Sequence, residues 1–173
     1  MKILGIDPGT ATTGFAILQN NKNLKNSDIK KFTAIDFGCI ITPAGMSAGK
    51  RLEIIYNDLC KLIKKHKPNL ISIETLFFFK NLKTVMPVSQ ARGVILLASA
   101  QNNIPVLEFT PLQVKMTIAG YGRAEKKQIQ QMIKETIDIS KFDMKKNNRN
   151  KDDAADALGV AICAGLHNKI LTN

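Results

Sequence analysis

Short apolar runs alternate with polar segments through the first quarter of the chain, and this pattern predicts strands. The runs at 2–6, 13–18 and 32–41 are rich in β-branched and aromatic residues, and a Pro-Gly turn follows directly after Asp7. The Lys- and Asn-rich stretch 21–31 predicts an exposed hairpin loop between the second and third runs. Three early strands in succession predict an antiparallel meander.

The spacing of the apolar residues then changes, and helices and strands are expected to alternate. Apolar residues repeat at helical spacing over 52–66, and Pro68 ends this predicted helix. The apolar run LISIE at 70–74 predicts a buried strand. The long apolar stretch 82–102 predicts a second helix, and PVLEF at 105–109 predicts a fifth strand.

The last third of the chain is expected to be mainly helical. Helical patterns occupy 111–118, 124–136 and 152–167, and the stretch 140–151 predicts a basic polar loop. Three strands followed by helix, strand, helix, strand and further helices predict an α/β fold, in which helices pack on a mixed sheet. The length of the chain predicts one domain spanning residues 1–173.

The charge balance of the chain favours a polyanionic partner. The 25 Lys and Arg residues exceed the 14 Asp and Glu residues by 11, and each basic side chain near a phosphate releases condensed counterions. Ribosomal, membrane-surface and solubility explanations compete with nucleic-acid binding. Charge by itself therefore leaves the partner open.

Cysteine content and the lengths of the apolar runs bear on the cellular compartment in which the protein is expected. Cys39, Cys60 and Cys163 are widely spaced and include no Cys-x-x-Cys pair, which argues against a structural zinc site and for reduced thiols. The N-terminal run MKILGID is too short for a signal peptide, and no apolar stretch reaches the roughly 18 residues that a membrane span needs. We therefore expect a cytoplasmic protein without membrane contact.

Acidic residues stand at the ends of apolar elements in this basic chain. Asp7 ends the first apolar strand and Glu74 ends the strand LISIE. Asp153 and Asp156 are three residues apart on the final helix, which makes them neighbours on one face. Carboxylates at the ends of buried elements need a cation or another partner, and carboxylate oxygens suit Mg²⁺ or Mn²⁺.

Each of these acids also has a purely structural interpretation. Asp7 precedes Pro-Gly and could be a turn residue, and Glu74 could be a strand-end residue paired with a lysine. Asp152 and Asp153 could cap the final helix and interact with its dipole. Spacing alone does not establish that the acids converge.

Five sequence blocks follow one another along the chain: GIDPGTATTGFAI, IETLFFFKN, SQARG, EFTPLQVKMTIAGYGRAEKKQIQQMI and DDAADALGVAICAGLH. In this order they resemble the RuvC family of crossover (Holliday) junction endodeoxyribonucleases, in the RNase H-like superfamily. The resemblance covers nearly the whole chain. The loop at 21–31 is longer than usual in that family, and Ser89 stands where Gly is expected. GIDPGT alone also resembles the phosphate-binding hairpin of actin-like ATPases, which need two such domains and a longer chain.

The resemblance implies both a fold and a catalytic metal site. The fold is a five-stranded mixed sheet, with three antiparallel strands followed by two parallel strands, flanked by helices. Two Mg²⁺ ions, which Mn²⁺ could replace, are expected on four catalytic carboxylates: Asp7, Glu74, Asp153 and Asp156. Asp152 lies one position ahead of the DxxD motif in the last block, and we do not include it.

Basic and aromatic side chains are expected to contact DNA. Lys115 and Lys126 match basic residues that the family uses near the scissile phosphate, with Lys126 offsetting developing charge, and the adjacent Lys127 is a further candidate. Phe77 matches an aromatic residue that stacks on bases at the junction, with Lys80 beside it. Three consecutive phenylalanines begin at Phe77; ordinary core packing is the alternative, but all three cannot face inward on one strand.

The function implied by the resemblance is metal-dependent resolution of Holliday junctions during recombination and repair. The expected enzyme makes paired nicks that leave 5′-phosphomonoesters, acts as a homodimer on a four-way DNA junction, and has RuvA and RuvB as partners. The apolar helix at 82–102 is the candidate dimer surface. Two alternatives stay open: a related RNase H-like nuclease acting on other branched nucleic acids, and a junction-binding protein without catalysis.

Overall fold

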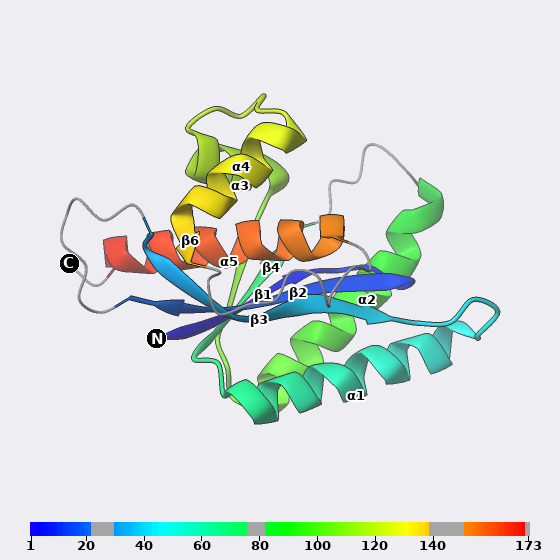
Figure 1. The fold of residues 1–173 in the computed structure, drawn as a ribbon. Helices are drawn as coiled ribbons and strands as arrows, with labels where there is room; N and C mark the ends of the chain where they lie inside the picture. The colour runs from blue at the N-terminus through cyan, green and yellow to red at the C-terminus, as the bar shows by residue number, and fades with distance from the viewer. Residues whose placement is uncertain (22–29, 76–81, 139–150, 172–173) are drawn as a thin grey trace.

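A computed structural model describes residues 1–21, 30–75, 82–138 and 151–171 (Figure 1). Most of the predicted hairpin loop and most of the predicted basic loop lie outside these ranges. Phe77 and Lys80 also lie outside the described residues, so their expected contacts with DNA stay predictions.

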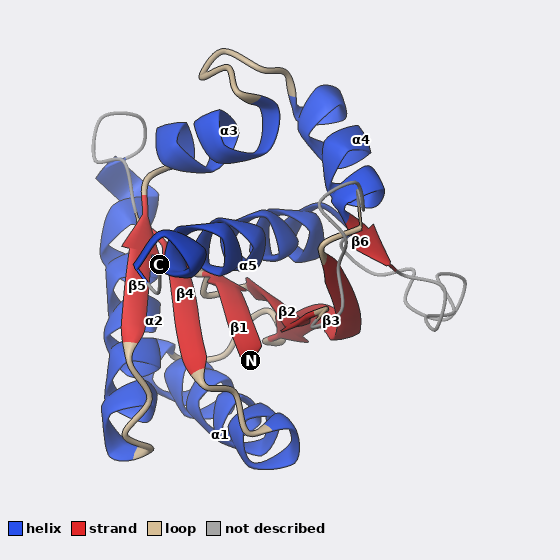
Figure 2. Ribbon diagram, turned by 90° about the vertical axis from the view of Figure 1, so that its left-hand side faces the viewer, coloured by secondary structure: helices blue, strands red, loops and turns tan. Residues whose placement is uncertain are grey.

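The described strands form one mixed sheet in the order β5-β4-β1-β2-β3-β6 (Figure 2). They are β1 (Lys2–Asp7), β2 (Thr12–Asn20), β3 (Phe32–Ile41), β4 (Leu70–Glu74), β5 (Val106–Phe109) and β6 (Ile137–Asp138). β1, β2 and β3 form the expected antiparallel meander. β4 is parallel to β1, and β5 is parallel to β4. The expected mixed sheet is therefore confirmed.

β6 is a short addition that the sequence pattern does not indicate. It runs parallel to the start of β3, where Ile137 pairs with Phe32 and Asp138 pairs with Thr33. Two residues are too few to show the alternation that marks a strand. Ile137 is fully buried, so packing against the core, rather than a local pattern, explains this sixth strand.

Helices cover both faces of the sheet (Figures 1 and 2). They are α1 (Ala48–His66), α2 (Leu82–Gln101), α3 (Pro111–Ala119), α4 (Lys126–Thr136) and α5 (Lys151–Leu171). α1 and α2 pack together on one face, whereas α5 lies on the other face against β1 and β2, and α3 and α4 pack over α5. No helix among the described residues is long and apolar enough to cross a membrane.

Alternation along β1 decides which of its residues meet α5. Leu4 and Ile6 are buried with apolar residues of α1 and α2, whereas Ile3 is buried with those of α5. Successive side chains of a strand point to opposite faces. Gly5 and Asp7 therefore share the α5 face with Ile3.

α5 approaches the sheet closely because small residues line the contact. A Cβ atom at Gly5 would collide with the backbone oxygen of Ala157, and one at Gly14 would collide with the backbone oxygen of Asp153. Every third or fourth residue of α5 is a buried alanine: Ala154, Ala157, Ala161 and Ala164. The close approach places the first turns of α5 over the ends of β1 and β2.

Candidate active site

The two strand acids end neighbouring parallel strands. β1 and β4 pair up to the residues just before Asp7 and Glu74, so these two acids lie at the same edge of the sheet. Ser72, two residues before Glu74, donates a hydrogen bond to the backbone oxygen of Val160 in α5 at 2.9 Å. Because strand side chains alternate, Glu74 faces α5, as Asp7 does.

The start of α5 brings two more acids to this edge. Asp153 and Asp156 share one face of the helix because they are three residues apart. The backbone of Asp153 lies against Gly14 of β2, the strand that pairs with β1 at Asp7. The partial positive charge of a helix N-terminus favours carboxylates in this position. We call Asp7, Glu74, Asp153 and Asp156 the acidic cluster.

Asp7 lies among the charges of the three other acids of the cluster and Lys126. Its pKa is raised from 3.8 to about 8, chiefly by burial and then by the carboxylates of Glu74, Asp156 and Asp153 in that order. The ammonium of Lys126 acts in the opposite direction. Ionised Asp7 therefore lies in a region where the protein supplies too little positive charge to compensate it.

Glu74 and Asp156 experience the same electrostatic conflict. The pKa of Glu74 is raised from 4.5 to about 7, chiefly by burial and then by the carboxylate of Asp156, whereas the ammonium of Lys126 opposes the rise. Burial also raises the pKa of Asp156, against the attraction of Lys126. The structure thus brings the four predicted acids and Lys126 together, and their roles in catalysis stay predictions.

Lys126 begins α4 and reaches down to α5. Its Nζ lies 3.4 Å from Oδ2 of Asp156 and 3.5 Å from Oδ2 of Asp152. Burial lowers the pKa of the Lys126 ammonium, but the two carboxylates outweigh burial, and the pKa is raised overall. Lys126 is therefore held as a cation at the edge of the acidic cluster.

A cleft of about 250 Å³ opens beside the acidic cluster, between α3, α4 and α5. Its polar lining consists of Glu74, Lys115, Lys126, Gln130 and Asp156. Lys115 contributes from α3 and Lys126 from α4, so the two predicted phosphate-contacting lysines border the same space. Lys127 is exposed on α4 and is not among the lining residues.

Two polar residues at this site are not among the predicted site residues: Gln130, which no motif indicates, and Asp152, which is set aside in favour of Asp153. Gln130 lines the cleft, and its Nε2 donates a hydrogen bond to Oδ1 of Asp152 at 3.2 Å. Gln130 follows Lys126 by four residues, so the helical period of α4 could have placed both on one face. The contact with Asp152 depends on how α4 packs on α5, which no local pattern reveals.

The donor set of the acidic cluster fits a divalent cation. Carboxylate oxygens are the ligands that Mg²⁺ and Mn²⁺ prefer. The pKa values of Asp7 and Glu74 are raised by burial and by neighbouring carboxylates, only partly offset by Lys126, so a cation would compensate these groups. In the part of the chain that the structure describes, no three Asp, Glu, His or Cys side chains are arranged to hold an ion as they stand. Asp156 contacts Lys126 instead, so ion binding requires local rearrangement of side chains.

The acidic cluster predicts an unusual pH dependence of stability in the metal-free protein. The folded-state pKa of Asp7 is raised from 3.8 to about 8, so the folded protein binds more protons than the unfolded chain between these values. Stability should therefore fall as the pH rises through this window and level off above it. In thermal melts in EDTA, the change in Tm between pH 6 and pH 8.5 should be smaller for Asp7→Asn than for wild type.

Asp58→Asn is the matched control, because Asp58 is a half-buried acid on α1, remote from the acidic cluster, and is paired with Lys61. It should keep the pH dependence of the wild type. An unchanged pH dependence in Asp7→Asn would contradict the electrostatic account of this site.

Solved structures with the same arrangement define the fold as RNase H-like. A Thermus thermophilus RuvC structure matches with a TM-score of 0.81 and 24% sequence identity, over 98% of this chain and 96% of that chain. The yeast mitochondrial Holliday junction resolvase Ydc2 matches with a TM-score of 0.61 and 16% identity, over 93% of this chain and 77% of that chain. At these identities the likeness concerns the fold.

Sequence comparisons identify the family within this class. The family model for crossover junction endodeoxyribonuclease RuvC matches residues 3–164. The RuvC protein of Fusobacterium nucleatum is 49% identical over 162 residues, which cover 94% of this chain and 78% of that protein. The RuvC protein of Clostridioides difficile is 46% identical over 170 residues, which cover 98% of this chain and 93% of that protein. The chain belongs to the RuvC family of crossover junction endodeoxyribonucleases.

Proposed function

We propose that this protein is a structure-selective DNA endonuclease that resolves four-way (Holliday) junctions by paired, metal-dependent nicks during recombination and repair. One observation carries the proposal: in a chain of the RuvC family, acids from β1, β4 and α5 converge beside a cleft bordered by Lys115 and Lys126. A relative with the same fold, Thermus thermophilus RuvC, is known in complex with a Holliday junction substrate.

Four carboxylates would hold two Mg²⁺ ions, or Mn²⁺ in their place: Asp7, Glu74, Asp153 and Asp156. When bound, such ions activate water and stabilise a leaving oxygen at a phosphodiester. Asp7 and Glu74 must lose their protons as cations bind, because the ionised carboxylate is the ligand. The bound cations would then compensate the negative charge that would otherwise repel the phosphate. The raised pKa values of Asp7 and Glu74 then make metal binding stronger at higher pH.

The lysines of the cleft would act on the substrate phosphate. Lys115 on α3 and Lys126 on α4 bring positive charge to the same space as Glu74 and Asp156. The ammonium of Lys126 would offset negative charge that develops on the phosphate during attack. Water adds to phosphorus, the bond to the 3′ oxygen breaks, and the products are a 3′ hydroxyl and a 5′ phosphate.

The substrate also implies an assembly. A two-fold homodimer presents two identical sites, which suits paired nicks in a junction that is itself nearly two-fold symmetric. α2 is the proposed dimer surface: Ala91, Ile95 and Ala98 are buried against the rest of the chain, whereas Met86 and Leu97 are exposed. We further propose a cytoplasmic setting, RuvA and RuvB as partners, and contacts with DNA from Phe77, Lys80 and Lys127.

Cleavage of a synthetic four-way junction tests the proposed function most directly. The purified protein should nick the junction symmetrically in Mg²⁺ and should bind without cleaving in EDTA. A linear duplex of the same sequence should survive. Binding without cleavage in Mg²⁺ would favour a non-catalytic junction-binding protein, and equal cleavage of flaps and forks would favour a broader nuclease.

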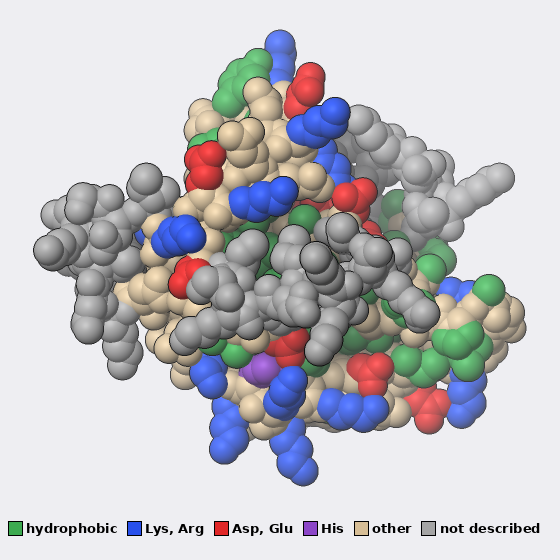
Figure 3. All heavy atoms as spheres, viewed as in Figure 1, with side chains coloured by type: hydrophobic (Ala, Val, Ile, Leu, Met, Phe, Trp, Pro, Cys, Tyr) green, Lys and Arg blue, Asp and Glu red, His purple; other side chains and the backbone are tan. Residues whose placement is uncertain are grey.

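Junction binding should depend steeply on salt because the protein is strongly basic. Figure 3 shows Lys and Arg side chains around α4 and along α1. The logarithm of the affinity should fall with the logarithm of the salt concentration, with a slope of about −0.9 per phosphate neutralised. Lys115→Ala should reduce this slope by roughly one and weaken binding, whereas Lys126→Ala should lower the cleavage rate more than the affinity.

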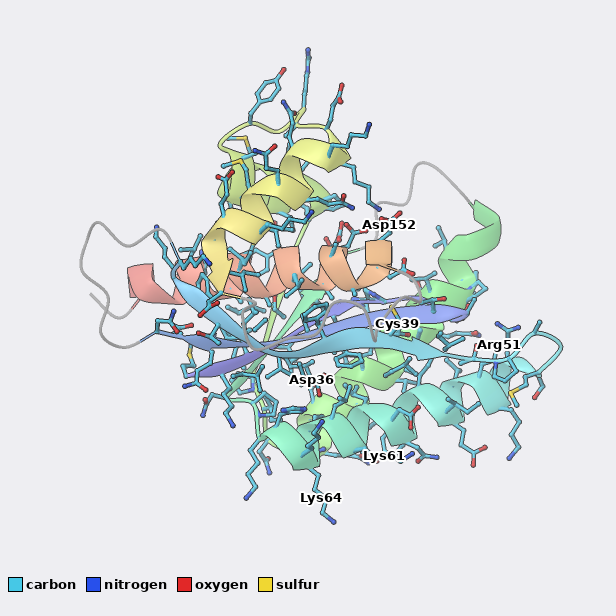
Figure 4. The ribbon with its side chains drawn as sticks, in the orientation of Figure 1. Asp36, Cys39, Arg51, Lys61, Lys64 and Asp152 are labelled. Carbon is cyan, nitrogen blue, oxygen red and sulfur yellow. The ribbon has the colours of Figure 1, made fainter. Side chains whose placement is uncertain are left out.

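Lys64→Ala is the matched control for Lys115→Ala in these titrations. Lys64 is exposed on α1, on the opposite face of the sheet from the cleft (Figure 4). Lys64→Ala should leave the junction affinity and its salt dependence unchanged. Equal losses in the two variants would mean that binding follows total charge and not the cleft.

A further inference from the structure

Asp152 connects the start of α5 to α4 through two side chains. Its Oδ1 accepts a hydrogen bond from Nε2 of Gln130 at 3.2 Å, and its Oδ2 lies 3.5 Å from Nζ of Lys126. Figure 4 shows Asp152 at the beginning of α5, beneath α4. Gln130 thus holds one oxygen of the carboxylate, and the other oxygen faces the lysine.

Two pairs of residues, each one helical turn apart, face one another here. Lys126 and Gln130 lie on one face of α4, and Asp152 and Asp156 lie on one face of α5. Lys126 is shared between the two acids of α5, with Nζ at similar distances from both. The same ammonium therefore has two carboxylate acceptors at once.

The two acceptors differ in their surroundings. Asp156 lines the cleft with Glu74, and its charge acts on both Asp7 and Glu74. Asp152 is not among the lining residues, and 69% of its side chain is exposed. A cation bound by the acidic cluster would need the Asp156 carboxylate, and the ammonium of Lys126 competes for it.

We propose, resting on the function proposed above, that Asp152 is a positioning residue that holds the Lys126 ammonium at the rim of the cleft when a metal ion takes its place on Asp156. The lysine then keeps a carboxylate partner during the exchange and stays beside the site that the substrate phosphate enters. Without Asp152, Lys126 has only Asp156 as an acceptor among these contacts, and competition with the metal increases.

A double-mutant cycle on metal binding in the absence of DNA tests this role. Mn²⁺ is titrated into the full-length protein and followed by electron paramagnetic resonance, for wild type, Asp152→Asn, Lys126→Gln and the double variant. Lys126→Gln should tighten Mn²⁺ binding about two- to fivefold, because the competing ammonium is gone. Asp152→Asn should weaken it by about the same factor.

The diagnostic result is the Mn²⁺ affinity of the double variant, compared with that of Lys126→Gln alone. Asp152→Asn should change Mn²⁺ affinity by less than about 1.5-fold in the Lys126→Gln background, because its effect passes through the lysine. An equal loss in both backgrounds would show that Asp152 attracts the metal directly and would overturn the proposal. No effect of Asp152→Asn in either background would overturn it as well. Asp152→Glu should restore wild-type affinity, and Asp58→Asn controls for the loss of one negative charge.

Failure of this inference is distinguishable from failure of the proposed function. Mn²⁺ affinity is measured without substrate, so the cycle can show coupling even in a protein that does not cleave junctions. Single-turnover cleavage supplies the second readout: Asp152→Asn should slow it about two- to fivefold only when Lys126 is present. If the wild type cleaves junctions normally but the cycle shows no coupling between Asp152 and Lys126, the role of Asp152 is overturned and the proposed function stands.

Discussion

Asp7→Asn is expected to lower the single-turnover rate of junction cleavage by about 10³-fold or more, while junction affinity stays close to that of wild type. Asp7 lies where β1 meets α5, and the charges of the three other acids of the cluster all act on it. The amide has a similar shape but cannot supply a charged ligand. It also reduces repulsion of the phosphate, so binding should not suffer.

The other members of the acidic cluster extend this prediction. Glu74→Gln, Asp153→Asn and Asp156→Asn should also abolish cleavage and preserve binding. Asp152→Asn should slow cleavage only about two- to fivefold, since Asp152 acts only through Lys126. A dead Asp152→Asn with an active Asp153→Asn would mean that the metal-binding acids of α5 are assigned in the wrong register.

Loss of folding cannot be mistaken for loss of chemistry in the Asp7 variant. Burial opposes ionisation of Asp7, so the neutral amide should stabilise the metal-free protein above neutral pH. The variant is therefore expected to be more stable than wild type at pH 8.5 and yet inactive. An Asp7→Asn protein that melts earlier at this pH would point to a structural role for the carboxylate.

The strand acids could be located from the sequence because their positions follow from local rules. An apolar run that ends in an acid places that acid at a strand end, and alternation assigns its face. Asp7 and Glu74 meet because β1 and β4 are parallel neighbours, an arrangement that the order of the predicted elements and the family resemblance both imply. The acids of α5 followed from a spacing of three residues on a helix.

The features that escaped sequence analysis depend on contacts between distant elements. Asp152 could be interpreted as a helix-capping residue, and its partners Lys126 and Gln130 are known only once α4 packs over α5. β6 exists because Ile137 is buried beside the start of β3, not because two residues show a strand pattern. The close approach of α5 to Gly14 likewise has no local signature.

Gly14 allows the first turn of α5 to pack directly on the sheet, because glycine has no Cβ atom. A Cβ atom at this position would collide with the backbone oxygen of Asp153 and would lie 3.2 Å from the backbone nitrogen of Ala154. Cys39 lies on β3, where it pairs with Gly14 of β2. The thiol of Cys39 contacts the same turn of α5, because the backbone N–H of Ala154 interacts with it. Backbone atoms cannot rotate away as a side chain could, so the first turn of α5 must move.

Gly14→Ala should therefore displace Asp153 and Asp156 relative to Asp7 and slow junction cleavage about 10²-fold, the usual effect of moving catalytic groups by roughly 1 Å. Mn²⁺ affinity should fall with the rate, whereas junction affinity should hold. Gly38→Ala is the matched control, since a Cβ atom there meets only the ring of Phe15, at 3.3 Å. Rates, Mn²⁺ affinities and melting temperatures of both variants decide the matter. Wild-type cleavage and metal affinity in a well-folded Gly14→Ala protein would show that α5 can shift without disturbing the acidic cluster.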